Sequence, residues 1–375
     1  LRHANRWFRR TARRLLVDRQ DTSIVAALTS MLGEQGQPAL ESLWALHGLG
    51  GLDAAATQQA LSHPNPHVRV WMIRLLGDAK QALSSGQAQS IMELTQDPHP
   101  EIASQIASSL QRFPTNQALP ILASLLKTER FTSDPFIPSQ LWWALEKHVT
   151  LDTPAVLSWL TDADLWHTPM VETKLLTTLA RRLAADPTSA NLNHSATLLE
   201  AVPDESSRRQ VTAGLERGLQ GITLTSVPTR LDAAFGDPTR MDTSSITLGM
   251  RLNSEAAIKT ASRLAADPDR PLEDRLQMIS RLAEKNRPQV ATLLVSLLQE
   301  PQVSQAALNG LRRFSDPKIA QHLVTLVTKT EPGTMRTTAI SVLAGRKTWA
   351  TMLVESIANG RCARESVPLD SLLVM

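Results

Sequence analysis

Residues 63–78, which read HPNPHVRVWMIRLLGD, contain the signals for the start and the end of one helix. Pro64 and Pro66 suit a first helical turn, where a missing N–H costs no intrahelical hydrogen bond. Gly77 suits the left-handed residue that closes a helix. Between these ends, apolar residues recur at three- and four-residue steps and form one face: Val68, Trp71, Met72, Leu75 and Leu76. Because so short a helix is not stable alone, we expect this face to pack on neighbouring helices of the same kind.

Similar helices recur along the whole chain. The last core leucine of each leading helix gives a series of markers spaced 29 to 36 residues apart: Leu16, Leu46, Leu76, Leu110, Leu145, Leu179, Leu215, Leu248, Leu282, Leu311 and Leu343. That spacing leaves room for two helices and two turns. A second apolar helix is indicated at residues 24–32, 119–126, 290–298 and 319–327. We therefore predict an all-α fold, an α-solenoid of about eleven HEAT-like helix pairs, in which Val68-Arg69 after Pro66 resembles the Pro-x-Val-Arg signature of HEAT repeats.

The composition of the chain fits an elongated array better than an ordinary helical domain. Of 375 residues, 42% are hydrophobic but only 4% are aromatic and none is tyrosine, which suits many thin helix-to-helix contacts. No apolar run reaches the length of a membrane span. Cys362 is the single cysteine, so an internal disulfide and a cysteine-rich metal site are both excluded.

The repeat pattern divides one continuous solenoid into three sections. Residues 1–126 and 263–375 follow it regularly, and residues 127–262 are divergent repeats with longer loops, expected near 127–138, 185–190 and 221–245. Such loops are candidate sites of a specialised surface, although ordinary loop divergence is the simpler explanation. The chain starts at Leu1 and ends in mid-pattern at residues 372–375, so we expect an internal piece of a longer protein.

Positive charge is concentrated at the N-terminus. The net charge is +3, yet residues 1–19 hold seven arginines against Asp18 alone. Trp7, Phe8, Leu15 and Leu16 form the apolar side of the first helix, so its arginines are expected to face solvent or another domain: Arg6, Arg9, Arg10, Arg13 and Arg14. An acidic neighbouring domain is the simplest partner, and phosphate is the alternative. Nucleic acid is not expected, because its binders spread Lys and Arg along the array.

Trp142 and Trp143 are the second candidate contact. Adjacent residues lie about 100° apart on a helix, so both can hardly face one core. We expect one of them at a helix edge or under the 127–138 connection, either as a binding hot spot or as core filling.

No motif for catalysis or cofactor binding occurs in the sequence. His63 and His67 have a metal-binding spacing, but prolines separate them and no third ligand is near, so we interpret them as structural. The chain has no His-Glu-x-x-His, phosphate loop, Gly-x-Ser-x-Gly or Cys-x-x-Cys-His motif. For this segment we therefore expect no enzyme activity, no catalytic residue, no metal and no cofactor.

Residues 3–16, 39–50 and 63–78 together carry a more specific resemblance. They resemble the helical middle of the planctomycete-type membrane-bound dehydrogenase family, also described as haem-binding Cys-x-x-Cys-His proteins. The match is specific over residues 1–80 and only repeat-like beyond. It implies a sugar-dehydrogenase-like β-propeller before this segment and a small c-type cytochrome domain after it.

The resemblance implies a non-catalytic scaffold that spaces or docks domains in an exported, periplasmic or cell-envelope electron-transfer protein. Haem c would belong to that parent, which could be an oxidoreductase. Cys362 cannot form a haem attachment, so no catalytic or haem residue of the family is carried onto this chain. The alternative is a free-standing HEAT-repeat adaptor for protein–protein interaction in the cytoplasm.

Overall fold

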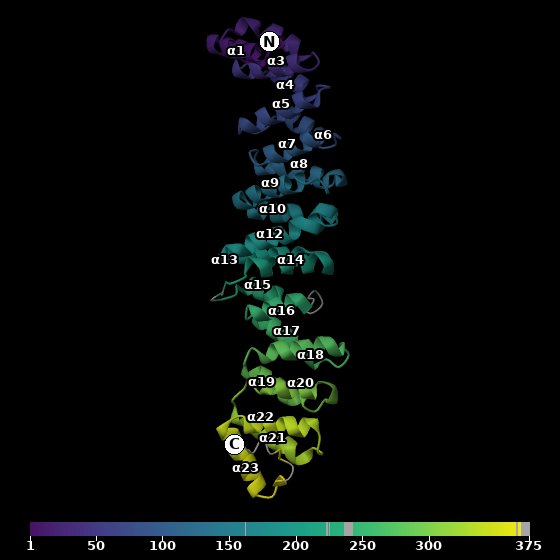
Figure 1. The fold of residues 1–375 in the computed structure, drawn as a ribbon, viewed down its shortest axis with the longest axis vertical. Helices are drawn as coiled ribbons and strands as arrows, with labels where there is room; N and C mark the ends of the chain where they lie inside the picture. Colours follow the sequence, from purple (N-terminus) through teal and green to yellow (C-terminus); the bar gives the residue numbers. More distant parts are fainter. Residues whose placement is uncertain (162, 223, 225, 236–242, 365–366, 369–375) are drawn as a thin grey trace. The chain divides into compact units, whose positions relative to one another are not determined.

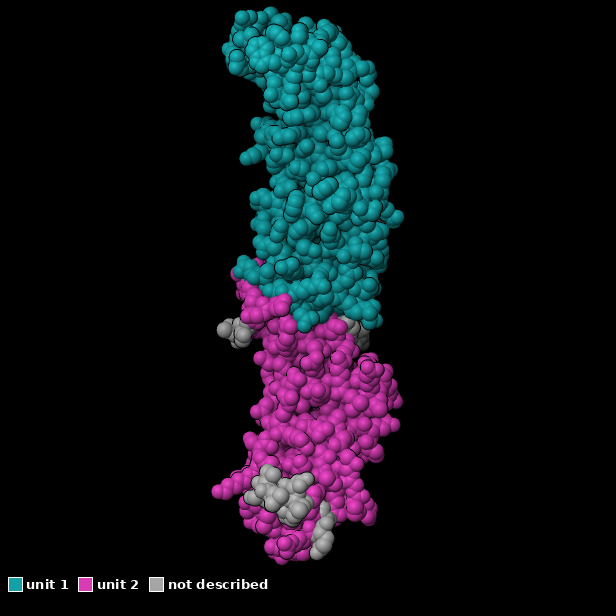
Figure 2. Space-filling model, viewed as in Figure 1, with its two compact units in different colours: residues 1–186, 197–218 teal, residues 187–196, 219–375 magenta. Residues whose placement is uncertain are grey.

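The structure is a computed structural model that describes residues 1–161, 163–222, 224, 226–235, 243–364 and 367–368. The chain forms two compact units (Figure 2), of which unit 1 comprises residues 1–186 and 197–218 and unit 2 comprises residues 187–196 and 219–375. Over the described ranges the regular structure is helical and contains no β-strand. None of the helices in these ranges has the length and apolar character that crossing a membrane requires.

The helices are short, and most have 8 to 15 residues. Those of unit 1 are α1 (Arg6–Arg19), α2 (Val25–Leu32), α3 (Gln37–Gly48), α4 (Ala54–Leu61), α5 (Pro66–Asp78), α6 (Ser85–Leu94), α7 (Pro100–Leu110), α8 (Thr115–Leu126), α9 (Ile137–Leu151), α10 (Thr153–Leu160), α11 (Ala163–Trp166), α12 (Leu176–Ala185) and α14 (Glu205–Gly218). Those of unit 2 are α15 (Thr229–Ala234), α16 (Thr243–Arg251), α17 (Glu255–Ala266), α18 (Leu272–Ala283), α19 (Pro288–Leu297), α20 (Pro301–Leu311), α21 (Pro317–Lys329), α22 (Thr334–Ala344) and α23 (Lys347–Ala358). Helix α13 (Ser189–Ala201) contributes residues to both units.

Each unit consists of two layers of stacked helices (Figure 1). In unit 1, α1, α3, α5, α7 and α9 contact one another in order, and α2, α4, α6, α8 and α10 form the second layer. In unit 2, α16, α18, α20 and α22 form one layer, and α15, α17, α19, α21 and α23 form the other. Each marker leucine of the sequence pattern lies in a different helix: nine lie in the layers of α1 to α9 and of α16 to α22, and Leu179 and Leu215 lie in α12 and α14. The predicted all-α solenoid is therefore confirmed.

The irregular connections lie largely where the sequence places them. A 3₁₀ turn (Glu129–Phe131) precedes α9, which begins one residue before the predicted end of its connection. The 185–190 turn joins α12 to α13. The short helix α15 forms within the predicted loop at 221–245, and residues 236–242 of this loop lie outside the described residues. The predicted chain end at residues 372–375 lies outside them as well. The three-section division stays a prediction, because the two units follow spatial contacts rather than regularity of the repeat.

The helix of residues 63–78 forms, but it does not end as predicted. Gly77 lies inside α5 and is buried, and Lys80 is the residue with positive φ, at 53°. A Cβ on Gly77 would lie 2.9 Å from the Cβ of Ser109 on α7. Gly77 is therefore needed for the close approach of two helices, which the sequence of α5 alone does not show.

The crossing of α12 and α14 depends on two glycines in the same way. A Cβ on Gly214 would lie 2.3 Å from the carbonyl oxygen of Thr177 and 2.7 Å from the Cβ of Ala180. A Cβ on Gly218 would lie 2.6 Å from the Cβ of Ala184. The two backbones pack directly against each other, so there is no flexible side chain that could move aside.

We predict that Gly214→Ala lowers the free energy of unfolding by about 1–3 kcal/mol, because the added methyl group forces α14 away from α12. Gly86→Ala is the matched control, since nothing lies within 4 Å of a Cβ there. It should leave stability unchanged or raise it by up to about 1 kcal/mol. Urea denaturation measures both, and equal effects of the two substitutions would contradict the close crossing.

His148 of α9 is buried and links two helices of the stack. Its Nε2 lies 2.9 Å from the carbonyl oxygen of Leu110, and its Nδ1 lies 3.1 Å from Oγ1 of Thr115. The carbonyl can only accept, so Nε2 carries the proton and Nδ1 can accept from the hydroxyl. Burial lowers the pKa of His148 below its ordinary value, with a smaller contribution from the charge of Lys147.

This lowered pKa predicts a loss of stability in mild acid. Below about pH 6.5 the unfolded chain binds a proton at His148 that the folded chain binds less readily, so stability is full above that pH and falls as the pH drops through it. In urea titrations at about pH 7.5 and about pH 5.5, His148→Gln should lose less stability than the wild type on acidification. An identical pH dependence of the wild type and His148→Gln would refute the role of His148.

Candidate functional site

The first helix begins with a structure that recurs sixty residues later. The Nδ1 atoms of His3 and His63 each accept a hydrogen bond from the backbone N–H two residues on, at 3.0 Å in both cases. Asn5 and Asn65 then cap their helices, at 2.8 and 3.0 Å. Within each start, an arginine donates to carbonyl oxygens five and six residues before it: Arg9 to His3 and Ala4, and Arg69 to His63 and Pro64. The pattern His-x-Asn-x-x-x-Arg thus defines one structural unit at residues 3–9 and 63–69.

Arg9 and its neighbour Arg13 also reach a carboxylate of the next repeat, Glu41. Arg9 Nε lies 3.0 Å from Glu41 Oε1, and Arg13 lies 2.7 Å from Glu41 Oε2. Glu41 is only 2% exposed and also accepts from the amide of Gln37 at 2.9 Å. The prediction that all the arginines face solvent or another domain is therefore wrong for Arg9 and Arg13, because a buried carboxylate on α3 holds them against their own chain.

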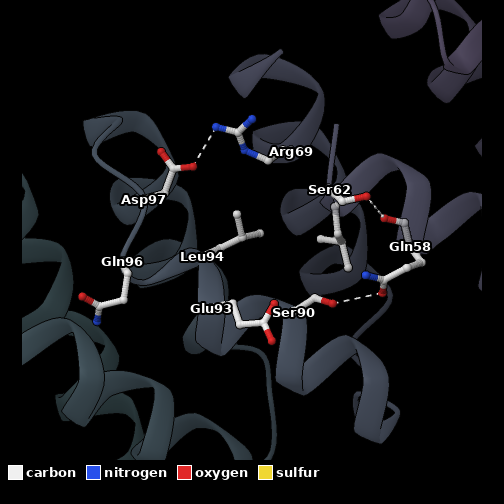
Figure 3. Close-up of a pocket in the computed structure, with 9 residues that line it drawn as sticks. Gln58, Ser62, Arg69, Ser90, Glu93, Leu94, Gln96 and Asp97 are labelled. Carbon is white, nitrogen blue, oxygen red and sulfur yellow. Dashed lines mark hydrogen bonds and ion pairs between the residues drawn. The ribbon is translucent and has the colours of Figure 1, made fainter. Parts of the chain in front are cut away.

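Arg69, the equivalent of Arg9 sixty residues later, lies beside a polar hollow on the second layer (Figure 3). Arg69 donates to Asp97 at 2.7 Å, and Ser90 of α6 donates to Gln58 of α4 at 3.0 Å. The hollow has a volume of about 420 Å³, and these four residues line it together with Leu61, Ser62, Glu93, Leu94 and Gln96. Its side chains connect successive repeats to one another, which makes this hollow a structural feature of the stack.

The side of the first helix that packs against the chain also differs from the predicted apolar side. Trp7, Phe8 and Leu15 are 63%, 50% and 41% exposed. The packed side of α1 carries Val17 instead, since a Cβ on Gly48 of α3 would lie 2.4 Å from Val17 Cγ2. The two ion pairs to Glu41 and this close contact rotate α1 so that its aromatic residues point outward.

Two tryptophans, Trp44 of α3 and Trp71 of α5, continue the contacts of the α1 arginines across the next two helices of the layer. The rings of Trp44 and Trp71 meet edge to face, with centroids 5.0 Å apart and an interplanar angle of 82°. Arg13 lies over Trp44, at 4.8 Å from Cζ to the ring centroid, and Arg74 lies over Trp71 at 4.9 Å. Such cation–π contacts hold the indole rings in fixed positions.

These helices enclose a groove of about 610 Å³, lined by Arg6, Arg9, Arg10, Arg13, Gln37, Glu41, Trp44, His47, Trp71 and Leu75. Arg6 and Arg10 are exposed, and neither forms an ion pair within the described ranges. Arg14 lies 3.9 Å from Asp18 on its own helix. The structure therefore brings four of the five predicted arginines to one groove, but only Arg6 and Arg10 have free charge there.

Trp142 and Trp143 lie away from this groove, on α9. Trp143 is 54% exposed and Trp142 is half-buried, so the two rings do not share one core. Phe136, just before α9, is 70% exposed. Trp143 of α9 and Phe136 before it are thus two exposed aromatic residues outside the groove.

The predicted structural role of His63 fits its contacts. Its side chain is buried and its Nε2 lies 3.0 Å from the carbonyl oxygen of Glu34, while His67 pairs with Glu101 at 3.2 Å. In the part of the chain that the structure describes, no group of three or more His, Cys, Asp or Glu is placed to hold a metal.

Glu41, Trp44 and Trp71 are the site residues that the sequence analysis missed. A carboxylate within the apolar run from Ala39 to Leu43 is one signal that could have found them. The sixty-residue repetition of His-x-Asn-x-x-x-Arg is the other, because it marks Arg9 as the equivalent of a structural arginine.

We predict that Glu41→Ala lowers the free energy of unfolding by about 2–3 kcal/mol, because Arg9 and Arg13 lose their shared partner. The loss stays below that for a fully buried pair since both arginines keep some contact with water. Glu34→Ala is the matched control: it removes a solvent-exposed ion pair with Arg2 and should cost much less stability. Thermal denaturation compares the two, and a smaller loss for Glu41→Ala would exclude its anchoring role.

Comparison with known proteins adds a family for one part of the chain. Residues 54–132, from α4 to the 3₁₀ turn before α9, match the family of HEAT repeats. No curated protein matches the chain. Among solved structures, the crystal structure of an engineered protein is similar over 96% of this chain and 97% of its own, with 13% identity and a TM-score of 0.29, a likeness too low to carry a structural conclusion.

None of these three comparisons bears on the dehydrogenase-associated family, which stays a prediction. The predicted HEAT-like character is confirmed for the matched part. Residues 54–132 are a HEAT-repeat segment within an all-helical solenoid.

Proposed function

We propose that the chain is a non-catalytic helical-repeat scaffold that docks neighbouring domains or other proteins on its surface. The observation that carries this proposal is the groove at α1, α3 and α5, where exposed Arg6 and Arg10 border Trp44 and Trp71. Tryptophan and arginine are the residues that most often dominate protein–protein binding energy. HEAT repeats supply a long surface of stacked helices, which suits the display of such a groove.

The proposal includes no metal, haem or nucleotide in this chain. It rests on the absence of every corresponding motif from the sequence, which has one cysteine and nine histidines. Metal analysis and haem staining of the purified protein test it, and a stoichiometric amount of either would overturn it.

The setting of the scaffold is a further part of the proposal. The resemblance of residues 1–80 supports a place between a propeller and a cytochrome domain in an exported electron-transfer protein. A free-standing cytoplasmic adaptor is the second candidate, which the match to HEAT repeats favours equally. Reading the gene in both directions for propeller strands, a signal peptide and a Cys-x-x-Cys-His motif separates the two.

Site-specific photocrosslinking in the native cells tests the docking function. A photoreactive residue in place of His47, which is exposed and lines the groove, should give one discrete protein adduct. The same residue in place of Ser85, which is exposed at the start of α6 and outside the groove, should give none. No adduct at position 47, or the same adducts at both positions, would overturn the assignment of the groove as the docking surface.

A further inference from the structure

We propose that the groove of α1, α3 and α5 takes an acidic amphipathic segment of a protein partner. Carboxylates of this segment pair with Arg6 and Arg10, and its apolar side chains contact Trp44 and Trp71. The inference rests on the docking function proposed above and specifies the chemistry of the partner.

The charges of the groove lead to an acidic partner. Its lining holds four arginines and one carboxylate, Glu41. That carboxylate already accepts hydrogen bonds from Arg9 and Arg13 and is almost fully buried, so it cannot compensate any further charge. The lining therefore keeps a surplus of three positive charges, because Arg9 and Arg13 share one carboxylate, and two of the arginines, Arg6 and Arg10, have no carboxylate partner at all.

The positions of these two arginines fit a segment better than a single ion. Arg6 and Arg10 are four residues apart, so they follow one another along the same face of α1. A partner with carboxylates one helical turn apart can pair with both at once. Their guanidinium groups also favour planar, two-point recognition of carboxylates.

The aromatic wall of the groove requires apolar groups on the partner. Trp44 and Trp71 are half-buried, and Arg13 and Arg74 hold their rings in place. Trp7, which follows Arg6 on α1, is 63% exposed but is not among the residues that line the groove. A small anion would leave these rings in water, whereas apolar side chains of a protein segment would cover them.

The shape of the site favours a protein segment over a lipid surface. The lining of the groove comes from three helices of one layer and includes the half-buried Trp44 and Trp71, which a flat bilayer would not cover. A narrow, rod-shaped partner can enter it and contact α1, α3 and α5 together. An acidic amphipathic helix has both this shape and the required two faces.

Isothermal titration with the full chain tests the proposal. The probe is a synthetic helical peptide of about eighteen residues with glutamates at four-residue steps beside leucines, and the comparison peptide has lysine at every glutamate position. The glutamate peptide should bind, the lysine peptide should not, and raising the salt from about 50 to about 500 mM should weaken binding strongly.

Arg6→Glu with Arg10→Glu should weaken binding of the glutamate peptide at least about tenfold, because attraction becomes repulsion. Arg270→Glu with Arg313→Glu is the matched control: both residues are exposed, lie in unit 2, and change the net charge by the same amount. It should leave the affinity unchanged. Arg6→Gln with Arg10→Gln gives a second, milder variant, and circular dichroism checks that each variant is folded.

Three results would overturn the proposal: no binding of the glutamate peptide, equal binding of both peptides, or loss of affinity in the control variant as large as in the groove variant. Cosedimentation with vesicles rich in phosphatidylserine, without peptide binding, would replace it with a membrane surface. If the glutamate peptide fails while position 47 still crosslinks to a protein, the docking function stands and only the acidic partner is excluded. If both experiments fail, both proposals fail.

Discussion

The helices of this protein are too short to be stable alone, and every other feature depends on this constraint. Helix α5 has 13 residues, and its core residues are buried because α3 and α7 lie on either side of it and α4 packs against it. The free energy of burial is therefore shared between successive repeats, which forces the backbones close together. Gly77 and Gly214 lie at such contacts, where a methyl group in place of the glycine hydrogen would meet the neighbouring helix.

Polar groups align the repeats that apolar contacts bring together. Arg9 reaches Glu41, and Arg69 reaches Asp97, each in the following repeat and each after satisfying carbonyl oxygens of its own helix start. Such pairs need a defined distance and direction, whereas apolar contacts are non-directional. Each pair thus fixes the rotation of one helix relative to the next.

At the N-terminus the same mechanism separates structural from available arginines. Glu41 takes Arg9 and Arg13, and the resulting rotation of α1 exposes Arg6, Arg10 and the ring of Trp7. A stacking requirement of the solenoid therefore produces a surface that combines positive charge with aromatic rings. Elsewhere in unit 1, the single arginine that lines the hollow of α4 and α6 is paired with Asp97, so this hollow has no free arginine to offer a ligand.

The sequence by itself determined the helices, their two-layer stacking and the concentration of charge at the N-terminus. Apolar steps of three and four residues depend only on local helical geometry, so they can be read directly, as in residues 63–78. Only the tertiary structure decided which side of α1 is packed, why Gly77 lies within a helix, and which arginines remain free. These outcomes depend on contacts between residues about thirty positions apart, Arg9 with Glu41 and Gly77 with Ser109. The periodicity along one helix cannot show them, because it carries no information on the neighbouring helix.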